Sequence, residues 1–405
     1  MASNPFQSPA PAGGPRPGEP VLGRHARILV TGGAGFIGRH LVKRLLREGA
    51  QVRVLDCLLE SVHGPDPAWP AELEGAELVR ADIREAETLA AALEGCAVVF
   101  HLAAETGTGE SMYRAQRYVD VNVGGTALLA DLIGRQSRRP QRVVLASSRA
   151  VYGEGAYRDR AGAVLHPGPR SEAALARAQW EPRGSDGASL EPLPMGPDCP
   201  PAPTSVYGET KRAQEEVLRL LLPALGVEFR ALRLQNVYGP GQSTRNPYTG
   251  ILSIFSVLLL QGDSIRVFED GLESRDFVFV DDVVEAFLAA AAGPGPGMTV
   301  DVGTGRRTSV LEVALALTRA LGVSQEAVRV TGEYRVGDIR HAFADTEGLV
   351  RHLGVAPRVS FEEGVARLTA WIRSVERPRS RLADALEEMS ALGLMGAGRA
   401  EHSDG

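Results

Sequence analysis

The sequence predicts an α/β fold organised around a doubly wound parallel sheet. Residues 27–234 alternate short apolar runs with helical patterns, as expected of consecutive βαβ units. The first apolar run, residues 27–30, leads through glycines into a helical pattern, and the next run ends in Asp56. These three observations together predict a Rossmann-like sheet that binds a dinucleotide.

Three glycines follow the first strand at a spacing of three. Gly32, Gly35 and Gly38 form a GxxGxxG pattern, which runs into a helical pattern at residues 40–49. Such glycines let the backbone approach a pyrophosphate, to which the helix N-terminus offers free N–H groups. On its own the pattern also fits a turn without a ligand. A P-loop is excluded because Arg39 and His40 stand where its Lys and Ser/Thr are required.

The acid that ends the second strand indicates which dinucleotide is bound. Asp56 follows the glycines at about the distance where a carboxylate meets the adenosine ribose. A carboxylate there favours NAD over NADP, because it would repel a 2′-phosphate. Arg53 precedes the acid and Cys57 follows it, so we expect no arginine at a phosphate clamp. The predicted cofactor is therefore NAD.

The remaining elements of the sheet follow in order. Strands are expected at residues 77–79, 97–102, 142–147 and 228–234, and helices near residues 84–93, 118–136 and 207–222. Ligands of such sheets bind beyond the carboxyl ends of the strands. Asp82 and Ile83 follow the third strand and suit the adenine edge, whereas Leu102, Ala103 and Ala104 follow the fourth. His101 is expected to be a hydrogen-bonded structural residue.

Polar side chains follow the fifth strand and open the helix after it. Ser147 and Ser148 end the strand and could simply cap a turn, and the segment is not the GxSxG of a hydrolase. Tyr207 and Lys211 are four residues apart and share one face of the next helix. By itself this spacing is common. Its position after a glycine turn, an acid and a strand-end serine favours an active site.

Composition limits the function classes. The chain has 405 residues, 44% hydrophobic and 23% charged, with a net charge of −6, as in an ordinary globular protein with no sign of nucleic acid as partner. Cys57, Cys96 and Cys199 form no disulfide or metal pattern, which favours a reducing cytoplasm. No apolar run is long enough to cross a membrane.

Three segments stand outside this regular pattern. Residues 1–24 are rich in Pro, Gly and Ala, without the apolar region of a signal peptide, and are expected to form a disordered arm. Residues 155–204 are too long for a βα loop and are expected to be a lid or a disordered insertion, with helical pieces near 171–178. The tail at 379–405 holds a possible helix at 382–392.

Several motifs in order resemble one family, the extended short-chain dehydrogenase/reductases and, within them, the NAD-dependent nucleotide-sugar epimerases and dehydratases. They are TGGAGFIG, HLAA, SSRAVYG, YGETK, RLQNVYGPGQ, RDFVFVDDV, VGTG and RVGDIRH, spread over residues 27–372. The resemblance implies an NAD-binding domain at 25–235 and a smaller C-terminal substrate-binding lobe at 236–378. It also implies a homodimer through the helices near 118–136 and 207–222.

The same resemblance implies the roles of individual residues. Catalysis is assigned to Ser148, Tyr207 and Lys211. NAD is assigned to Gly32, Gly35, Phe36, Ile37, Gly38, Asp56, Asp82, Ile83, Leu102, Ala103, Ala104, Asn122, Tyr207 and Lys211. The nucleotide sugar is assigned to Glu105, Ser148, Asn236, Arg275, Arg335 and Asp338, in which arginine forks suit phosphate oxygens.

A closer similarity, to 4-epimerases of dTDP-L-rhamnose, is carried by ETGTGESM, VNVGGT and the motif at residues 246–256. Relatives of this group carry paired cysteines in the insertion, but here only Cys199 stands there, so no metal is expected. A 4,6-dehydratase is disfavoured because Arg149 and Ala150 replace its acid and base. A UDP-hexose or UDP-hexuronate 4-epimerase, a 4-ketoreductase and a non-catalytic NAD sensor remain as alternatives.

The chemistry implied is transient oxidation at the sugar C4. The phenolate of Tyr207 removes the C4 hydroxyl proton while NAD⁺ takes the hydride, and the keto sugar turns over before it takes the hydride back. Bringing a tyrosine pKa from about 10 to about 7 needs about 4 kcal/mol. One cation about 4 Å away supplies roughly this at an effective dielectric of about 20. Lys211, together with the nicotinamide charge, is expected to do so.

Overall fold

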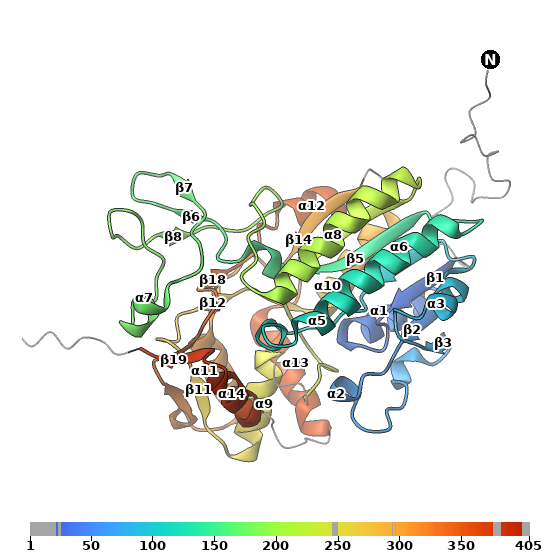
Figure 1. Cartoon of the computed structure of the whole chain (residues 1–405). Coiled ribbons are helices and arrows are strands. Elements are labelled where there is room, and N and C mark those ends of the chain that lie inside the picture. Colours follow the sequence, from blue (N-terminus) through green and yellow to red (C-terminus); the bar gives the residue numbers. More distant parts are fainter. Residues whose placement is uncertain are drawn as a thin grey trace, which may run out of the picture.

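The computed structural model describes residues 22, 26–244, 250–293, 295, 297–375 and 382–398 (Figure 1). The arm expected at 1–24 lies outside the described residues except for residue 22. Residues 245–249, which include the start of the motif at 246–256, also lie outside the described residues. The last part of the tail, 399–405, lies outside them as well. Among the described residues, no helix combines the length and apolar character that a membrane span requires.

A parallel sheet is the centre of the fold. Within the described residues it has seven strands in the order β14-β9-β5-β4-β1-β2-β3. The strands are β1 (Arg27–Thr31), β2 (Gln51–Asp56), β3 (Glu77–Arg80), β4 (Val98–His101), β5 (Arg142–Ser148), β9 (Glu228–Leu234) and β14 (Met298–Val302). The predicted doubly wound sheet is confirmed. Thr31 pairs with Leu55 on one side and His101 on the other, so the strand order reverses beside the glycine turn and opens a crevice there.

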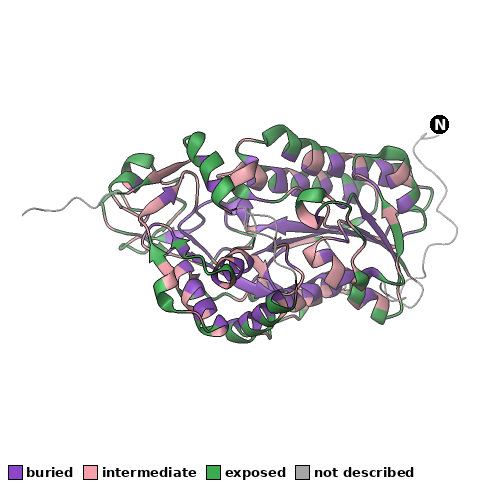
Figure 2. Ribbon diagram, turned by 90° about the horizontal axis from the view of Figure 1, so that it is seen from below, coloured by how far each residue is buried: buried purple, intermediate pink, exposed green. Residues whose placement is uncertain are grey.

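Helices cover both faces of this sheet. One face carries α1 (Phe36–Arg47), α10 (Val280–Ala292) and α12 (Glu347–Leu353), and the other carries α3 (Ala86–Leu93), α6 (Gly125–Arg135) and α8 (Val206–Ala224). The strands are mostly buried on both sides, as their branched apolar side chains predict, except for the edge strand β3, which is largely exposed. Figure 2 shows the buried positions along the sheet and on the inner faces of the helices.

Residues after 236 build a second, smaller core but also return to the large sheet, as β14 and α10. The second core packs α9 (Ile251–Gln261), α11 (Val310–Leu321) and α13 (Phe361–Ser374) against short strands. These strands are β10 (Asn236–Tyr238), β11 (Ile265–Val267), β12 (Ser274–Arg275), β13 (Phe277–Phe279), β15 (Thr308–Ser309), β16 (Val328–Val330), β17 (Glu333–Arg335) and β18 (His341–Ala342). Because β10 pairs with β13, Asn236 is held beside Phe277.

The insertion at 155–204 was expected to be either a lid or a disordered segment, and because it is folded the second of these alternatives was wrong. It forms a small antiparallel sheet of β6 (Tyr157–Arg158), β7 (Val164–Leu165) and β8 (Glu191–Pro192). The short helix α7 (Glu172–Ala176) lies between β7 and β8 in the sequence. Met195 and Cys199 pack with Ile339 and Ala342 of the C-terminal part. This apolar contact attaches the insertion to the second core.

The tail is also ordered in its first part. It forms α14 (Leu382–Ala391), close to the expected helix, and then β19 (Met395–Ala397), which pairs with β17. The shorter helical segments of the chain are α2 (Glu60–His63), α4 (Thr108–Ser111), α5 (Ala115–Tyr118), a π-helical segment Val119–Gly124, and 3₁₀ turns at Ala71–Leu73, Arg149–Tyr152 and Gln325–Ala327. The strand β19 has no counterpart in the sequence prediction, because three residues without a branched or aromatic side chain give no strand pattern.

Candidate functional site

A cavity of about 490 Å³ lies at the carboxyl ends of the strands, where the large sheet meets β10 and α9. Its lining includes most residues singled out from the sequence. These are Gly32, Gly35, Phe36, Ile37, Gly38, Asp56, Asp82, Ile83, Leu102, Ala103, Ala104, Glu105, Ser148, Tyr207, Lys211 and Asn236. The cavity therefore gathers the ends of six strands of the large sheet, as a crevice at a switch in strand order does.

The glycine turn is closed against its neighbours, which explains why side chains are missing there. Gly32 has a φ of 69°, and a Cβ on it would lie 2.6 Å from the backbone nitrogen of Ala103. A Cβ on Gly38 would collide with the carbonyl oxygen of Gly32. The turn thus leads directly into α1 and leaves the backbone N–H groups of the helix start at the cavity. This cradle fits a dinucleotide pyrophosphate.

Asp56 is held in place at the end of β2 by two backbone groups. Ala34 N–H donates to one carboxylate oxygen at 3.0 Å and Leu58 N–H donates to the other at 2.9 Å. The carboxylate remains part of the cavity lining, as a ribose-binding acid requires. Arg39 also lines the cavity and lies within electrostatic reach of Asp56. The sequence analysis considered only the neighbours of this acid in the chain, Arg53 and Cys57, and did not consider this arginine of α1.

Tyr207 lies near the start of α8, which Ser205 caps by accepting a hydrogen bond from Gly208 N–H. Burial raises the pKa of Tyr207, while a hydrogen bond with Ser148 and the charge of Arg149 lower it. Ser148 ends β5 and brings its hydroxyl to the phenol. The serine and the tyrosine predicted to act together are thus brought together.

Lys211 lies one turn further along α8 but is not in direct contact with the phenol oxygen. Its ammonium donates to the carbonyl oxygen of Ala146 at 2.9 Å and lies 6.0 Å from the centre of the Tyr207 ring. Burial lowers the pKa of Lys211 to about 7, and Glu215 offsets part of that effect. The role of Lys211 in making Tyr207 acidic stays a prediction, and Arg149 is a second cation, whose charge lowers the pKa of the phenol.

A buried polar network behind the cavity holds β1, β4 and the helices in register. His101 contacts the hydroxyls of Thr31 and Thr126 at 2.8 and 2.9 Å, and burial lowers its pKa to about 3. It is the structural residue that we expected. Asn122 donates to Glu105 O and to the Thr210 hydroxyl, and it is fully buried. Its amide is thus engaged behind the cavity wall, not in the lining where an NAD ligand was expected.

Three residues assigned to the nucleotide sugar form a cluster beside the cavity without lining it. Arg275 and Arg335 each pair with Asp338 at 3.0 Å. Burial opposes ionisation of Asp338, but the arginines around it outweigh that effect and lower its pKa. The insertion supports this cluster, because Arg170 donates to the backbone carbonyl of Asp338 at 2.8 Å. The sequence analysis assigned these three residues to one ligand, and the structure brings them together. It did not expect the insertion to contact them.

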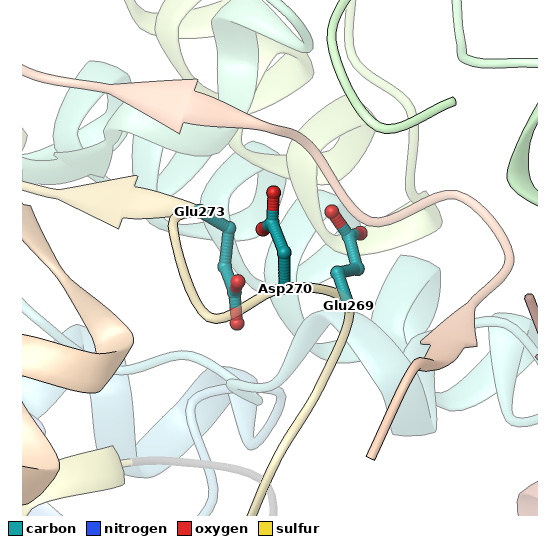
Figure 3. A group of neighbouring side chains, drawn as sticks. All are labelled: Glu269, Asp270 and Glu273. Atoms are coloured by element: carbon teal, nitrogen blue, oxygen red, sulfur yellow. The ribbon is translucent and has the colours of Figure 1, made fainter. Parts of the chain in front are cut away.

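An acidic group lies next to this cluster, in the loop between β11 and β12. Figure 3 shows Glu269, Asp270 and Glu273, whose ligand atoms lie within 4.8 Å of one another. The fully buried guanidinium of Arg340 pairs with Glu269 at 2.9 Å and with Asp270 at 2.7 Å. The same side chain reaches Glu181 of the insertion. The group is thus part of an ion-pair network that joins the insertion to the second core.

Two lining residues were missed as site residues. Arg149 was considered only as a reason against a dehydratase, yet its Nε donates to Asn236 Oδ1 at 2.8 Å. Gln235 is 4% exposed and lines the cavity, and neither amide atom has a hydrogen-bond partner among the described residues. A charged or polar side chain directly after a strand in an α/β sheet was the available signal.

The sequence was compared with known proteins. The profile of the NAD dependent epimerase/dehydratase family matches residues 28–179 and 186–303. The chain is 42% identical to a dTDP-L-rhamnose 4-epimerase of Burkholderia thailandensis, over 85% of this chain and 94% of that protein. It is 32% identical to a UDP-glucose 4-epimerase of Mycolicibacterium smegmatis, over 86% and 99%. The crystal structure of a Thermus thermophilus UDP-glucose 4-epimerase with NAD superimposes with a TM-score of 0.68 at 29% identity, covering 86% of this chain and 100% of that one.

Proposed function

Because the chain belongs to the NAD-dependent epimerase/dehydratase family, we propose that it is a nucleotide-sugar 4-epimerase that acts on a dTDP-6-deoxyhexose. The substrate pair would be of the dTDP-L-rhamnose and dTDP-6-deoxy-L-talose type. The observation that carries the proposal is the meeting of Ser148 and Tyr207 in one cavity with the glycine turn and Asp56. The 42% identity to the Burkholderia thailandensis enzyme supports the choice of sugar.

The residues of the cofactor end suit NAD. Asp56 would accept hydrogen bonds from the adenosine ribose, and the N–H groups after Gly35 would face the pyrophosphate. When bound, NAD⁺ accepts the C4 hydride, returns it, and adds a positive charge to the site. Lys211, fixed to the Ala146 carbonyl, holds its ammonium near the tyrosine ring.

Tyr207 and Ser148 would handle the proton of the substrate. The Tyr207 oxygen removes the C4 hydroxyl proton as a general base and later returns it, which typically contributes about 10²–10⁴ in rate. The Ser148 hydroxyl donates to the phenolate and favours that form. Arg149 lowers the pKa of Tyr207 through its charge, so two neighbours in sequence at the end of β5 act on the same oxygen.

The test is to incubate the protein, without added coenzyme, with a panel of dTDP- and UDP-sugars and to follow C4 epimers by NMR. We expect conversion of a dTDP-6-deoxyhexose. Conversion of UDP-hexoses or UDP-hexuronates only would favour the other 4-epimerase candidate, which the Mycolicibacterium smegmatis relative represents. Turnover that depends on added reduced coenzyme would show a ketoreductase and contradict the proposal.

We also propose that the chain forms a homodimer through the side of the molecule that carries α6 and α8. Val119, just before α6, is 46% exposed, and Leu220 and Leu221 of α8 are 64% and 41% exposed. Large apolar side chains gathered on neighbouring helices are typical of an interface. Sedimentation analysis of the protein and of Leu220→Glu tests this, since a dimer should dissociate in the variant. A monomer at all concentrations would contradict the proposal.

A further inference from the structure

Arg149 occupies the junction between the two halves of the site. It follows Ser148 directly, at the carboxyl end of β5, and it lines the cavity together with Tyr207 and Asn236. Its Nε donates to Asn236 Oδ1 at 2.8 Å. This hydrogen bond fixes one edge of the guanidinium and leaves the terminal nitrogens for another partner.

No carboxylate of the described residues forms an ion pair with this guanidinium. The charges it senses are those of Arg275, which repels it, and of Asp338 and Tyr207. Asp338 already pairs with both Arg275 and Arg335. Glu154 and Glu273 also act on Arg275, so the carboxylates of this region are engaged by other guanidiniums and none pairs with Arg149.

Withdrawal from water disfavours the charged form of Arg149. Burial lowers the pKa of Arg149 to about 9, the repulsion from Arg275 adds to that effect, and Asp338 offsets only part of it. Arg149 is partly buried, and a cation withdrawn from water without a partner is destabilised unless an anion is provided. The position thus calls for an anionic ligand that reaches the cavity between Tyr207 and the Arg275–Asp338 pair.

We propose that Arg149 binds the β-phosphate of the nucleoside diphosphate sugar, as a third guanidinium beside Arg275 and Arg335. This inference rests on the proposed function. A sugar whose C4 hydroxyl meets Tyr207 and a nucleotide held at Arg275 and Asp338 must be joined by a diphosphate that passes Arg149. Of the two phosphates, the β-phosphate carries the sugar and is the nearer to Tyr207. Two charge-assisted hydrogen bonds from the free edge of the fork would hold it.

Arg149 then recognises the β-phosphate, which a nucleoside diphosphate has and a monophosphate lacks. Calorimetry on the NAD-loaded protein with dTDP and with thymidine monophosphate separates the phosphates. Arg149→Met should weaken dTDP binding roughly 10- to 100-fold, the usual range for a lost charge-assisted contact, and leave the monophosphate nearly unaffected. Arg149→Lys should restore part of the affinity. Arg160→Met, an exposed arginine of the insertion, is the control with the same charge change.

The results distinguish a failure of the proposed function from a failure of the role of Arg149. If wild type binds neither dTDP nor UDP, the proposed function itself fails. If wild type binds dTDP and Arg149→Met binds it equally well, this inference is overturned while the function stands. Unchanged dTDP affinity with an acidic limb of kcat moved to higher pH would assign Arg149 to Tyr207 alone and overturn it as well. An NAD affinity that matches wild type shows that the variants are folded.

Discussion

The two ends of the cavity are built by different means. The glycine turn and the acid of the cofactor end come from one stretch, residues 32–56, in which Gly32, Gly38 and Asp56 are fixed by backbone contacts. The nucleotide-sugar end comes from segments far apart in the chain, and Arg340 alone joins Glu181 of the insertion to Glu269 and Asp270. Steric fit holds the residues of the cofactor end in place, whereas paired charges hold those of the nucleotide-sugar end.

This difference predicts how each end responds to change. A close backbone contact tolerates no added atom but is insensitive to pH and salt. A buried charge network depends on every partner, because removal of one leaves the others uncompensated. Variants can therefore damage one end and spare the other, and Tyr207, which lies between them, should affect neither binding step.

The largest effect is expected for Tyr207→Phe, which removes the phenol oxygen where the two ends meet. We expect kcat to fall by about 10²–10⁴, the usual contribution of a general base. Affinities for NAD and dTDP should remain near wild type in calorimetry. Turnover close to that of wild type would remove Tyr207 from its role as the base.

Arg340→Met tests the charged end. Since the guanidinium is fully buried among carboxylates, the variant should lose about 3–5 kcal/mol in the free energy of unfolding. Urea denaturation measures this loss. The exposed pair Arg351–Glu347 provides the control, since Arg351→Met should cost less than about 1 kcal/mol. Equal losses in the two variants would show that the network contributes no more than a surface pair.

Gly38→Ala tests the steric end. The added methyl group meets the Gly32 carbonyl, so the turn must shift. Restoring the turn when NAD binds would cost about 1–3 kcal/mol, the range for such overpacking, or roughly 5- to 150-fold in NAD affinity. Calorimetry with NAD measures this, and dTDP affinity should not change. In Gly134→Ala the added Cβ lies at an ordinary 3.5 Å from Leu225, so that control should bind NAD normally. Normal NAD binding by Gly38→Ala would refute the role of the close contact.

The smallest effect is a pH dependence at the charged end. Burial, with repulsion from Glu269, raises the pKa of Glu273 to about 7, against about 4.3 in an unfolded chain. The folded state then binds more protons between these values, so its stability falls as pH rises from about 4.3 through 7. Glu273→Gln removes that loss. Its Tm should exceed wild type at pH 8, on the order of 2 °C, but not at pH 4.

A control of equal charge completes the pH experiment. Glu347 is exposed on α12, and its side chain is 65% accessible. Glu347→Gln should not raise the Tm above that of wild type at either pH value. A gain for Glu273→Gln that is the same at pH 4 and pH 8 would show that titration of this carboxyl is not its cause.

Local sequence predicted every strand of the large sheet except β14, because each of the others carries its own signal. Runs of branched apolar residues gave β1, β2, β5 and β9 within one residue, since parallel strands buried on both faces are mainly apolar. The strand β14 and the helix α10 follow residue 236 in the sequence, among segments that build the second core, yet they belong to the large sheet and to its helical layer. Their place depends on long-range pairing with β9, which no local pattern encodes.

The sequence by itself determined the sheet, the glycine turn, the acid of the cofactor end and the positions of Ser148 and Tyr207. These follow from backbone geometry and from spacing along the chain, which short-range rules describe. The tertiary structure alone decided that the insertion folds onto the second core, that Lys211 donates to Ala146, and that Arg149 faces the phenol. Those contacts depend on which charges are buried together, and burial is set only when distant segments pack.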